Sequence, residues 1–295
     1  MKKIGISCQG LVRQYGCEKA FAICKESGFD AVDYGLTGFS MNSAVYAGSE
    51  DAFFSYFDNV RRLAEKYELE ISQTHGRTGT YMPENEEHNE TVRLLTERDL
   101  RATAILGAPC CVIHFPNSHR WGKQPPEVMH RVSGEMYDTF LPWAEKYKVK
   151  IAMETFGAAR IDGDRIRDFF ADPAEFLHQY NRFDTEYKTM CVDTGHTHEA
   201  ESFWVPPPQD MIRILGSDIS VLHLHDNNGH YDDHLLPGMG NIGWPAVFEA
   251  LSDIGYTGVY NFELALKFGN LTEEFVRFAG KYLRAFVDAE GNLKG

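Results

Sequence analysis

Short apolar runs recur along the 295-residue chain at nearly constant intervals, and six of them are followed by a chemically reactive side chain. An interval of 30 to 40 residues accommodates one strand, one helix and their two connections. A repeated strand–helix unit is therefore the strongest constraint on the fold. The six reactive residues, separated by 39, 40, 39, 30 and 40 positions, are His75, His114, Glu154, Asp193, His223 and Glu263.

Eight such units can be traced, and between them apolar residues recur at helical spacing. The clearest helix carries Phe53, Phe57, Val60, Ala64 and Tyr67, which are spaced 4, 3, 4 and 3 apart. Residues 1–295 contain no Pro/Gly/Ser-rich linker, so we expect a single α/β domain, a (β/α)₈ TIM barrel. The predicted strands cover residues 3–8, 31–34, 69–74, 110–113, 150–153 and 190–192, a run from Ile219, and residues 259–262.

A doubly wound open sheet is the alternative architecture. It should place a glycine-rich phosphate loop after the first strand, and the segment that begins at Ser7, Ser-Cys-Gln-Gly-Leu, is not one.

Three connections are predicted from the pattern alone. A long helix should run from after His75 to about Leu106, and an irregular loop of roughly 17 residues should follow Glu154. A second loop, holding Trp204 and three prolines, should follow Asp193. Arg160, Arg165 and Arg167 fall in the first loop; we interpret them as solvated, with a small phosphate site as the alternative.

The composition limits the kinds of partner and the cellular compartment that we expect. The net charge is −14, and no basic stripe of the kind that binds polyanions is present, so no nucleic-acid partner is expected. No apolar run approaches the roughly 18 residues of a membrane span. The six cysteines form no Cys-x-x-Cys pair. These features are typical of a cytoplasmic protein.

The strand-end residues predict a metal site. In a closed barrel the carboxyl ends of the strands meet at one rim, where active sites form. Three carboxylates brought together there would repel one another unless a cation neutralised them. We therefore expect one divalent metal ion, bound by Glu154, Asp193, His223 and Glu263.

Each residue taken singly has a plainer explanation. Glu154 or Glu263 alone could be a charge at a helix N-terminus, and Asp193 could belong to a simple turn. An isolated His75 or His114 is more often a structural histidine than a ligand. The shared spacing favours the metal site over these separate explanations.

Three further groups lie one step outward: His196, Asp232 and His234. Together with His75 and His114 they either bind substrate hydroxyls or complete additional metal sites. His225 should point inward like His223 by strand alternation, and sequence alone leaves open which of the two is the ligand.

At these residues the chain resembles the xylose isomerase-like barrel superfamily of sugar isomerases and epimerases, inosose dehydratases and type IV apurinic endonucleases. The likeness covers most of the chain and is specific to the superfamily rather than to one activity. The stretches that carry it are Ala152-Met-Glu154-Thr, Cys191-Val-Asp193-Thr-Gly-His196, Leu222-His223-Leu-His-Asp226, Asp232-Asp-His234-Leu-Leu-Pro-Gly-Met-Gly240 and Phe262-Glu263.

The branches of this superfamily imply different sites. The ketose 3-epimerase branch implies one metal on the four predicted ligands, with His196 near the substrate. The endonuclease branch implies a trinuclear zinc site, to which His75, His114, His196, Asp232 and His234 would also contribute. Against that branch, residues 35–50 hold no Lys or Arg, where such endonucleases usually place a DNA-inserting loop.

We therefore expect a metal-dependent isomerase or epimerase of carbohydrate metabolism, acting on a small ketose or keto-polyol through an enediolate. Glu154 and Glu263 would be its acid/base pair. Phe115, Trp121 and Phe156 would exclude water or pack in the core. One nitrogen and three carboxylates suit Mn²⁺, Mg²⁺ or Co²⁺, and extra histidines would favour Zn²⁺; Mn²⁺ is the first choice.

Two other functions remain open at this stage. A keto-polyol dehydratase of the inosose type would use the same base and Lewis acid to expel water. A non-catalytic carbohydrate-binding barrel would keep ligand affinity after Glu154→Gln. The resemblance also implies a homo-oligomer, either a dimer or a tetramer.

Overall fold

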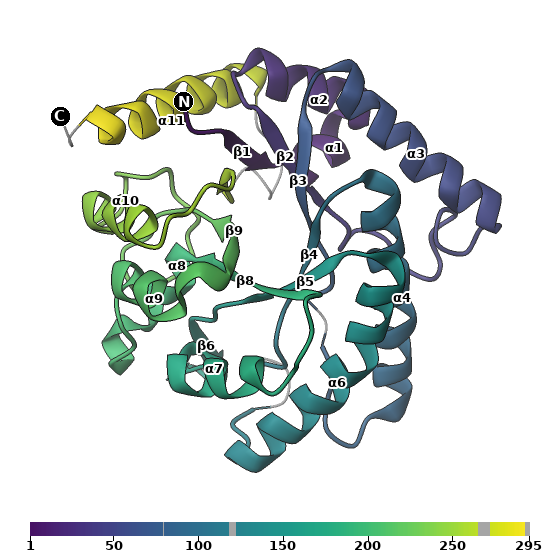
Figure 1. The fold of residues 1–295 in the computed structure, drawn as a ribbon, viewed down its shortest axis with the longest axis vertical. Coiled ribbons are helices and arrows are strands. Elements are labelled where there is room, and N and C mark those ends of the chain that lie inside the picture. Colours follow the sequence, from purple (N-terminus) through teal and green to yellow (C-terminus); the bar gives the residue numbers. More distant parts are fainter. Residues whose placement is uncertain (79, 118–121, 265–271, 293–295) are drawn as a thin grey trace.

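The computed structural model describes residues 1–78, 80–117, 122–264 and 272–292. Eight parallel strands form a barrel with helices around its outside (Figure 1). Their order is β10-β1-β2-β3-β4-β5-β8-β9. The strands are β1 (Ile4–Ser7), β2 (Ala31–Gly35), β3 (Glu70–His75), β4 (Cys110–Ile113), β5 (Lys150–Glu154), β8 (Lys188–Asp193), β9 (Ile219–His223) and β10 (Tyr260–Phe262).

Backbone contacts just beyond β9 close the ring onto β10. Leu224 pairs in parallel with Phe262. The Leu224 N–H donates to the Asn261 carbonyl at 2.9 Å, and the Glu263 N–H donates to the Leu224 carbonyl at 3.1 Å. The predicted (β/α)₈ barrel is confirmed.

Ten α-helices are described in these ranges. Three single-turn 3₁₀ helices accompany them at Phe169–Ala171, Glu201–Phe203 and Gly216–Asp218. The α-helices are α1 (Gln9–Tyr15), α2 (Cys17–Glu26), α3 (Glu50–Lys66), α4 (Glu86–Leu106), α6 (Pro126–Tyr147), α7 (Pro173–Asn181), α8 (Thr194–Ala200), α9 (Pro208–Leu215), α10 (Trp244–Asp253) and α11 (Glu273–Asn292).

The helix with the clearest periodicity forms as predicted. Phe53, Phe57, Val60 and Ala64 are the buried residues of α3. The Ser49 side chain accepts a hydrogen bond from the N–H of Ala52, which caps the first turn. The buried stripe packs α3 against the barrel. None of the helices in the described ranges is long and apolar enough to cross a membrane.

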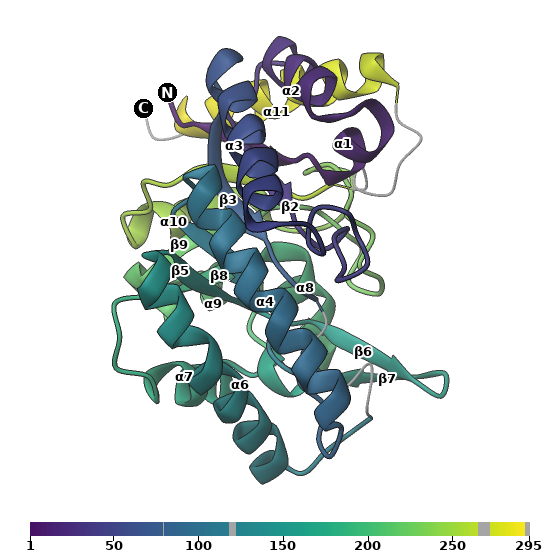
Figure 2. The same ribbon diagram turned by 90° about the vertical axis from the view of Figure 1, so that its right-hand side faces the viewer.

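Three predicted connections differ from the structure. The predicted loop after Glu154 contains a two-stranded hairpin, β6 (Ala158–Ile161) and β7 (Asp164–Arg167), which projects from the barrel (Figure 2). The hairpin turns at Asp162 and Gly163, whose φ angles of 51° and 90° suit the Asp-Gly pair of a tight turn. The predicted loop after Asp193 begins instead with α8, and α4 starts only at Glu86.

The barrel interior beneath the strand ends is small and apolar. Its cluster consists of Cys110, Val112, Ala152, Cys191 and Val221, all buried. The interior is thus packed with side chains, as in other barrels of this architecture, and leaves the carboxyl-terminal rim as the place for a site.

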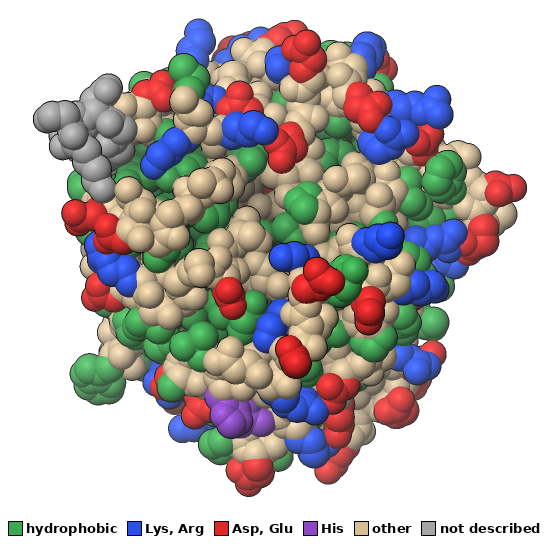
Figure 3. Space-filling view, viewed as in Figure 1, with side chains coloured by type: hydrophobic (Ala, Val, Ile, Leu, Met, Phe, Trp, Pro, Cys, Tyr) green, Lys and Arg blue, Asp and Glu red, His purple; other side chains and the backbone are tan. Residues whose placement is uncertain are grey.

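Charges of both signs are interspersed on the molecular face drawn in Figure 3, and that face carries no continuous basic stripe. The distribution agrees with the net charge of −14.

Candidate active site and metal centre

Every strand-end residue predicted from the sequence lies at the rim of the barrel. His75, Glu154, Asp193 and His223 are the last residues of their strands. The parallel pairing places Asp193 directly beside His223. His114 and Glu263 follow β4 and β10 by one residue. His75, His114, Glu154 and Glu263 line a cavity of about 460 Å³.

Four of the six strand-end residues bring their donor atoms together: Glu154, Asp193, His223 and Glu263. One ligand atom from each lies within 4.8 Å of all the others. The Nδ1 atom of His223 is 2.7 Å from Glu154 Oε1, 3.6 Å from Glu263 Oε2 and 4.0 Å from Asp193 Oδ2. None of the four is more than 5% exposed. This is the group that the spacing predicts as a metal site.

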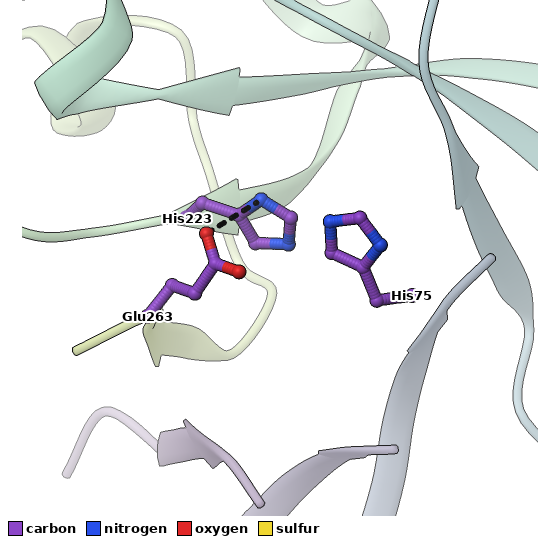
Figure 4. Close-up of side chains that lie close together, drawn as sticks. All are labelled: His75, His223 and Glu263. Carbon is purple, nitrogen blue, oxygen red and sulfur yellow. Dashed lines mark ion pairs between the residues drawn. The ribbon is translucent and has the colours of Figure 1, made fainter. Parts of the chain in front are cut away.

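A second group of donors adjoins the first and shares Glu154. His114 Nε2 is 2.6 Å and His75 Nε2 is 3.9 Å from Glu154 Oε2. The His75 and His223 rings stack with centroids 5.2 Å apart, and Figure 4 shows both rings beside Glu263. His75 donates from Nδ1 to the Gly76 carbonyl at 3.1 Å, which directs Nε2 toward the carboxylates.

Asp232 organises the outer groups. Its Oδ2 atom lies 2.8 Å from His234 Nε2 and 3.7 Å from His196 Nε2. His234 also donates from Nδ1 to the backbone carbonyl of Glu263 at 2.7 Å, so it links the loop after β9 to the end of β10. The predicted outer residues therefore lie beside the group of four donors.

The electrostatics of the site keep two carboxyls ionised. Burial would raise the pKa of Glu154, but the imidazoles of His223 and His114 hold that pKa well below its usual value. Burial would also raise the pKa of Asp193, but nearby imidazoles, with His196 first among them, lower it. Both groups are thus in the form that binds a cation.

The pKa of His196 is raised well above its usual value. Burial opposes the shift, and the carboxylates of Asp193 and Asp232 cause it. The pKa of Asp232 is well below its usual value. The imidazoles of His196 and His234 lower it, and burial opposes the shift. His196 is therefore a cationic donor at the wall of the cavity.

His223 and His225 have different surroundings in the structure. His225 donates from Nε2 to the Asp193 carboxylate, with distances of 2.9 and 3.1 Å to its two oxygens. His223 instead contributes to the four-residue group, and His225 holds one member of that group in place. His225 also forms a smaller donor group with His234 and Glu263.

Sequence reasoning missed the side of the cavity formed by β1 and β2. Asp33 is 1% exposed, accepts a hydrogen bond from Ser7 Oγ at 3.0 Å and lies 3.6 Å from His223 Nε2. Gln9 and Arg13 line the cavity from α1. A usable signal was present: Asp33 is a carboxylate inside an apolar strand, 42 positions before His75.

The expected aromatic residues fall in three different places. Phe115 is wholly buried in the core. Phe156 lines the outer part of the site and packs on His114 and His196, with centroids 5.2 and 6.1 Å away. Trp121 lies outside the described residues.

The loop after β9 is held by Asp226, which belongs to one of the stretches that carry the family resemblance. The Asp226 carboxylate accepts hydrogen bonds from the N–H of Gly238, the N–H of Ile242 and Nε1 of Trp244 at 2.8 to 3.1 Å. Asp226 is thus fully used in shaping the loop that presents Asp232 and His234.

The sequence predicts solvated arginines in this segment, but two of the hairpin arginines contact neighbouring segments. Arg165 donates to the carbonyls of Glu199 and Gly229 and to Ser202 Oγ. Arg160 stacks on Tyr231. The hairpin is therefore tied to α8 and to the loop after β9.

Comparisons with known proteins give both sequence and structural relatives. The model of the xylose isomerase-like TIM-barrel family matches residues 21–274. An uncharacterized protein of Methanocaldococcus jannaschii is 30% identical over 215 residues, 69% of this chain and 67% of that protein. An uncharacterized protein of Mycobacterium tuberculosis is 26% identical over 263 residues, 87% of this chain and 86% of that protein.

Three solved structures illustrate the structural likeness. A D-tagatose 3-epimerase-like protein has a TM-score of 0.76 and 22% identity, covering 99% of this chain and 100% of its own. The E. coli 3-keto-D-glucoside 4-epimerase has a TM-score of 0.72 and 16% identity, covering 97% and 100%. The IOLI protein with a bound zinc atom has a TM-score of 0.71 and 17% identity, covering 97% and 98%. At these identities the likeness shows a shared fold.

Proposed function

Because the chain belongs to the xylose isomerase-like TIM-barrel family, we propose that it is a metal-dependent isomerase or epimerase of a small ketose or keto-polyol. The observation that supports the proposal most is the buried group of four donors, of which Glu154 and Glu263 line the cavity. Two proteins that share the fold, a D-tagatose 3-epimerase-like protein and the E. coli 3-keto-D-glucoside 4-epimerase, have names that refer to a ketose and to a keto-glucoside, which supports the substrate class.

The donor set fits a divalent cation. An ion with ligand bonds of about 2.0 to 2.2 Å joins donors up to roughly 4.4 Å apart, close to the 4.8 Å limit within which this group lies. When bound, the ion would act as a Lewis acid that acidifies a C–H between a carbonyl and a hydroxyl. Three oxygens and one nitrogen favour Mn²⁺, Mg²⁺ or Co²⁺, with Mn²⁺ first, and participation of His75 and His114 would favour Zn²⁺.

Glu154 and Glu263 are the proposed acid/base pair. Their strands, β5 and β10, are three positions apart in the eight-stranded ring, so the two carboxylates approach a bound sugar from different sides. One would remove a proton from the carbon beside the carbonyl, and the other would return a proton to the enediolate. Glu154 is ionised at neutral pH, which suits a proton acceptor.

The remaining polar groups suit a polyhydroxyl substrate. His196 donates from Nδ1 to the Thr155 carbonyl at 3.1 Å, which fixes its ring at the cavity wall. His196 and His114 both line the cavity, where they can donate to substrate oxygens. Ser7, Gln9 and Thr37 add hydroxyl and amide groups on the opposite side.

Deuterium exchange tests the proposal. Protein loaded with Mn²⁺, Co²⁺ or Zn²⁺ is incubated in D₂O with fructose, tagatose, psicose, sorbose and an inosose, and proton NMR follows the carbon beside the carbonyl. We expect exchange with at least one of these sugars, and its loss in Glu154→Gln and Glu263→Gln. Glu135→Gln, at an exposed position of α6, is the matched control. A product that has lost one water molecule would identify a dehydratase. Binding without exchange in any of these sugars would refute catalysis on them.

A second function is favoured by one observation. The donors of His75, His114 and Glu154 also lie within 4.8 Å of one another, beside the first group, as an apurinic endonuclease with several zinc ions would require. The charge of −14 and the absence of Lys and Arg from residues 35–50 count against it. Cleavage of an abasic duplex by zinc-loaded protein, together with about three zinc ions per chain, would favour this function instead.

A further inference from the structure

A second cavity of about 520 Å³ lies outside the first. We propose that the substrate has two units, a reacting sugar in the inner cavity and a second sugar ring in this outer cavity. The inference rests on the proposed function and names its substrate class as a glycosylated ketose or keto-sugar. The residues that line the outer cavity alone include Asn117, Phe156, Arg160, Glu199 and Tyr231.

The two cavities adjoin. Thr78, His114, His196 and Asp232 line both of them. A ligand in the inner cavity that extends past His196 and Asp232 would therefore enter the outer one. Each cavity is within the size range of about 300 to 1,000 Å³ that is usual for small-molecule sites.

A buried acceptor in the outer cavity points to a ligand. Asn117 is 6% exposed, and its Oδ1 atom has no hydrogen-bond partner in the part of the chain that the structure describes. A buried acceptor without a partner costs about 1 to 3 kcal/mol. A hydroxyl group of a bound sugar would supply the missing donor.

The outer cavity also has an aromatic wall. Tyr231 is 59% exposed, and the Arg160 guanidinium lies 4.5 Å from its ring centroid. Arg160 donates to the His230 carbonyl at 3.2 Å, which joins the β6–β7 hairpin to the loop after β9. Tyr231 and Phe156 supply the apolar surface, and Arg160 supplies donors, that together recognise a sugar ring.

The wall is held from behind by Arg165. This side chain donates to the Gly229 carbonyl at 2.9 Å and to Ser202 Oγ at 3.2 Å, and its Nε atom lies 3.7 Å from Glu199 Oε1. The hairpin, α8 and the loop after β9 are thus fixed relative to one another. A wall fixed in advance reduces the ordering cost of binding.

The charges favour a neutral second unit over an anionic one. Arg160 and His196 line this cavity together with the carboxylates of Glu199 and Asp232, so its lining has no excess of positive charge. An anionic group placed there would be close to both carboxylates, whereas a sugar hydroxyl can accept from Arg160 and donate to Asn117 or Glu199.

Ligand affinity tests the inference with named probes. Calorimetry on metal-loaded protein compares fructose with isomaltulose and maltulose, two disaccharides that keep a ketose end, and with fructose 6-phosphate as the anionic probe. We expect at least one disaccharide to bind about tenfold more tightly than fructose. Equal affinities, no binding of either disaccharide, or the largest gain with fructose 6-phosphate would overturn the inference.

Variants test whether the gain in affinity for the disaccharide comes from the outer cavity. Asn117→Leu and Tyr231→Ala should reduce the advantage of the disaccharide to less than threefold, whereas Asn117→Asp, which keeps the acceptor, should retain most of it. Arg167→Ala is the matched control, because Arg167 is on the same hairpin but pairs with Asp172 at 2.8 Å. An advantage that survives both Asn117→Leu and Tyr231→Ala would place the second unit elsewhere and refute the inference.

The deuterium-exchange experiment separates this inference from the proposed function. Exchange with fructose, without any preference for disaccharides, would refute the outer subsite and leave the proposed function standing. A preference that depends on Asn117 and Tyr231, without deuterium exchange in the monosaccharides or in either disaccharide, would support the subsite and refute the isomerase.

Discussion

Replacing Gly195 with alanine should weaken metal binding although no ligand is altered. Gly195 lies in α8 directly against the His225 ring, and an added Cβ would be 2.7 Å from His225 Nε2 and closer still to two other ring atoms. His225 is fully buried and supports the Asp193 carboxylate with a contact of 2.9 Å. Because the added Cβ would overlap the His225 ring, the ring must move and give up that contact.

The magnitude follows from two opposing effects. Alanine is favoured over glycine inside a helix by up to about 1 kcal/mol, so α8 itself should gain stability. Loss of the hydrogen bond that supports a metal-ligating side chain typically lowers metal affinity by about 10- to 100-fold. This loss corresponds to roughly 1.4 to 2.7 kcal/mol. Displacing the buried His225 ring should also cost the folded state about 1 to 3 kcal/mol, which the gain in helix propensity offsets only in part, so metal affinity is measured on protein confirmed to be folded.

Competition with a fluorescent chelator, using Mn²⁺ and Zn²⁺, measures the change. Gly243→Ala is the matched control, because an added Cβ there meets no described atom within 4 Å and the φ angle of −77° suits alanine. We expect the control to bind metal as the wild type does. A dissociation constant of Gly195→Ala within threefold of the wild type would refute the support that we assign to His225.

Three further predictions concern the surroundings of the site. Asp99→Ala should lower the free energy of unfolding by about 3 to 5 kcal/mol in urea titrations, because it leaves buried Arg77 without its two-contact partner at 2.8 and 3.0 Å; a loss below 1 kcal/mol would contradict this. Removing metal with a chelator should lower Tm by roughly 7 °C relative to protein with free metal about 1,000-fold above Kd, since bound metal then contributes about 4 kcal/mol; an unchanged Tm would count against a bound ion. Arg165→Met should speed amide hydrogen exchange across residues 158–167 by at least tenfold, whereas Arg167→Met should not, and equal protection in both would show that Arg165 does not hold the hairpin.

The barrel and its rim could be predicted from the sequence because two regularities coincide. Each buried parallel strand is a short apolar run, and the first polar residue after it has to lie at the rim. Glu154, Asp193 and His223 are at strand ends for this reason, and parallel register brings them together.

The elements that were missed depend on local signals or on tertiary contacts. Asp162 and Gly163 form a typical hairpin turn, but the short β6 and β7 strands lack the apolar alternation of a buried strand. The start of α8 depends on Asp193, which accepts from the His196 N–H at 2.7 Å and is thus also an N-cap.

The cavity walls could not be read from periodicity at all. Asp33 lies within a strand rather than after one, so a rule based on strand ends passes over it. The outer cavity combines Asn117, Arg160 and Tyr231, which come from three separate connections. Only the folded barrel brings such distant segments together.

The number of tightly held metal ions tests the central claim most directly. Native mass spectrometry and elemental analysis, after dialysis against Mn²⁺, Co²⁺ or Zn²⁺, would compare the wild type with His223→Gln and with His178→Gln, a control at an exposed position of α7. We predict one ion per chain in the wild type and in His178→Gln, and none in His223→Gln. A wild type that retains no ion, or a His223→Gln protein that retains it fully, would contradict the account.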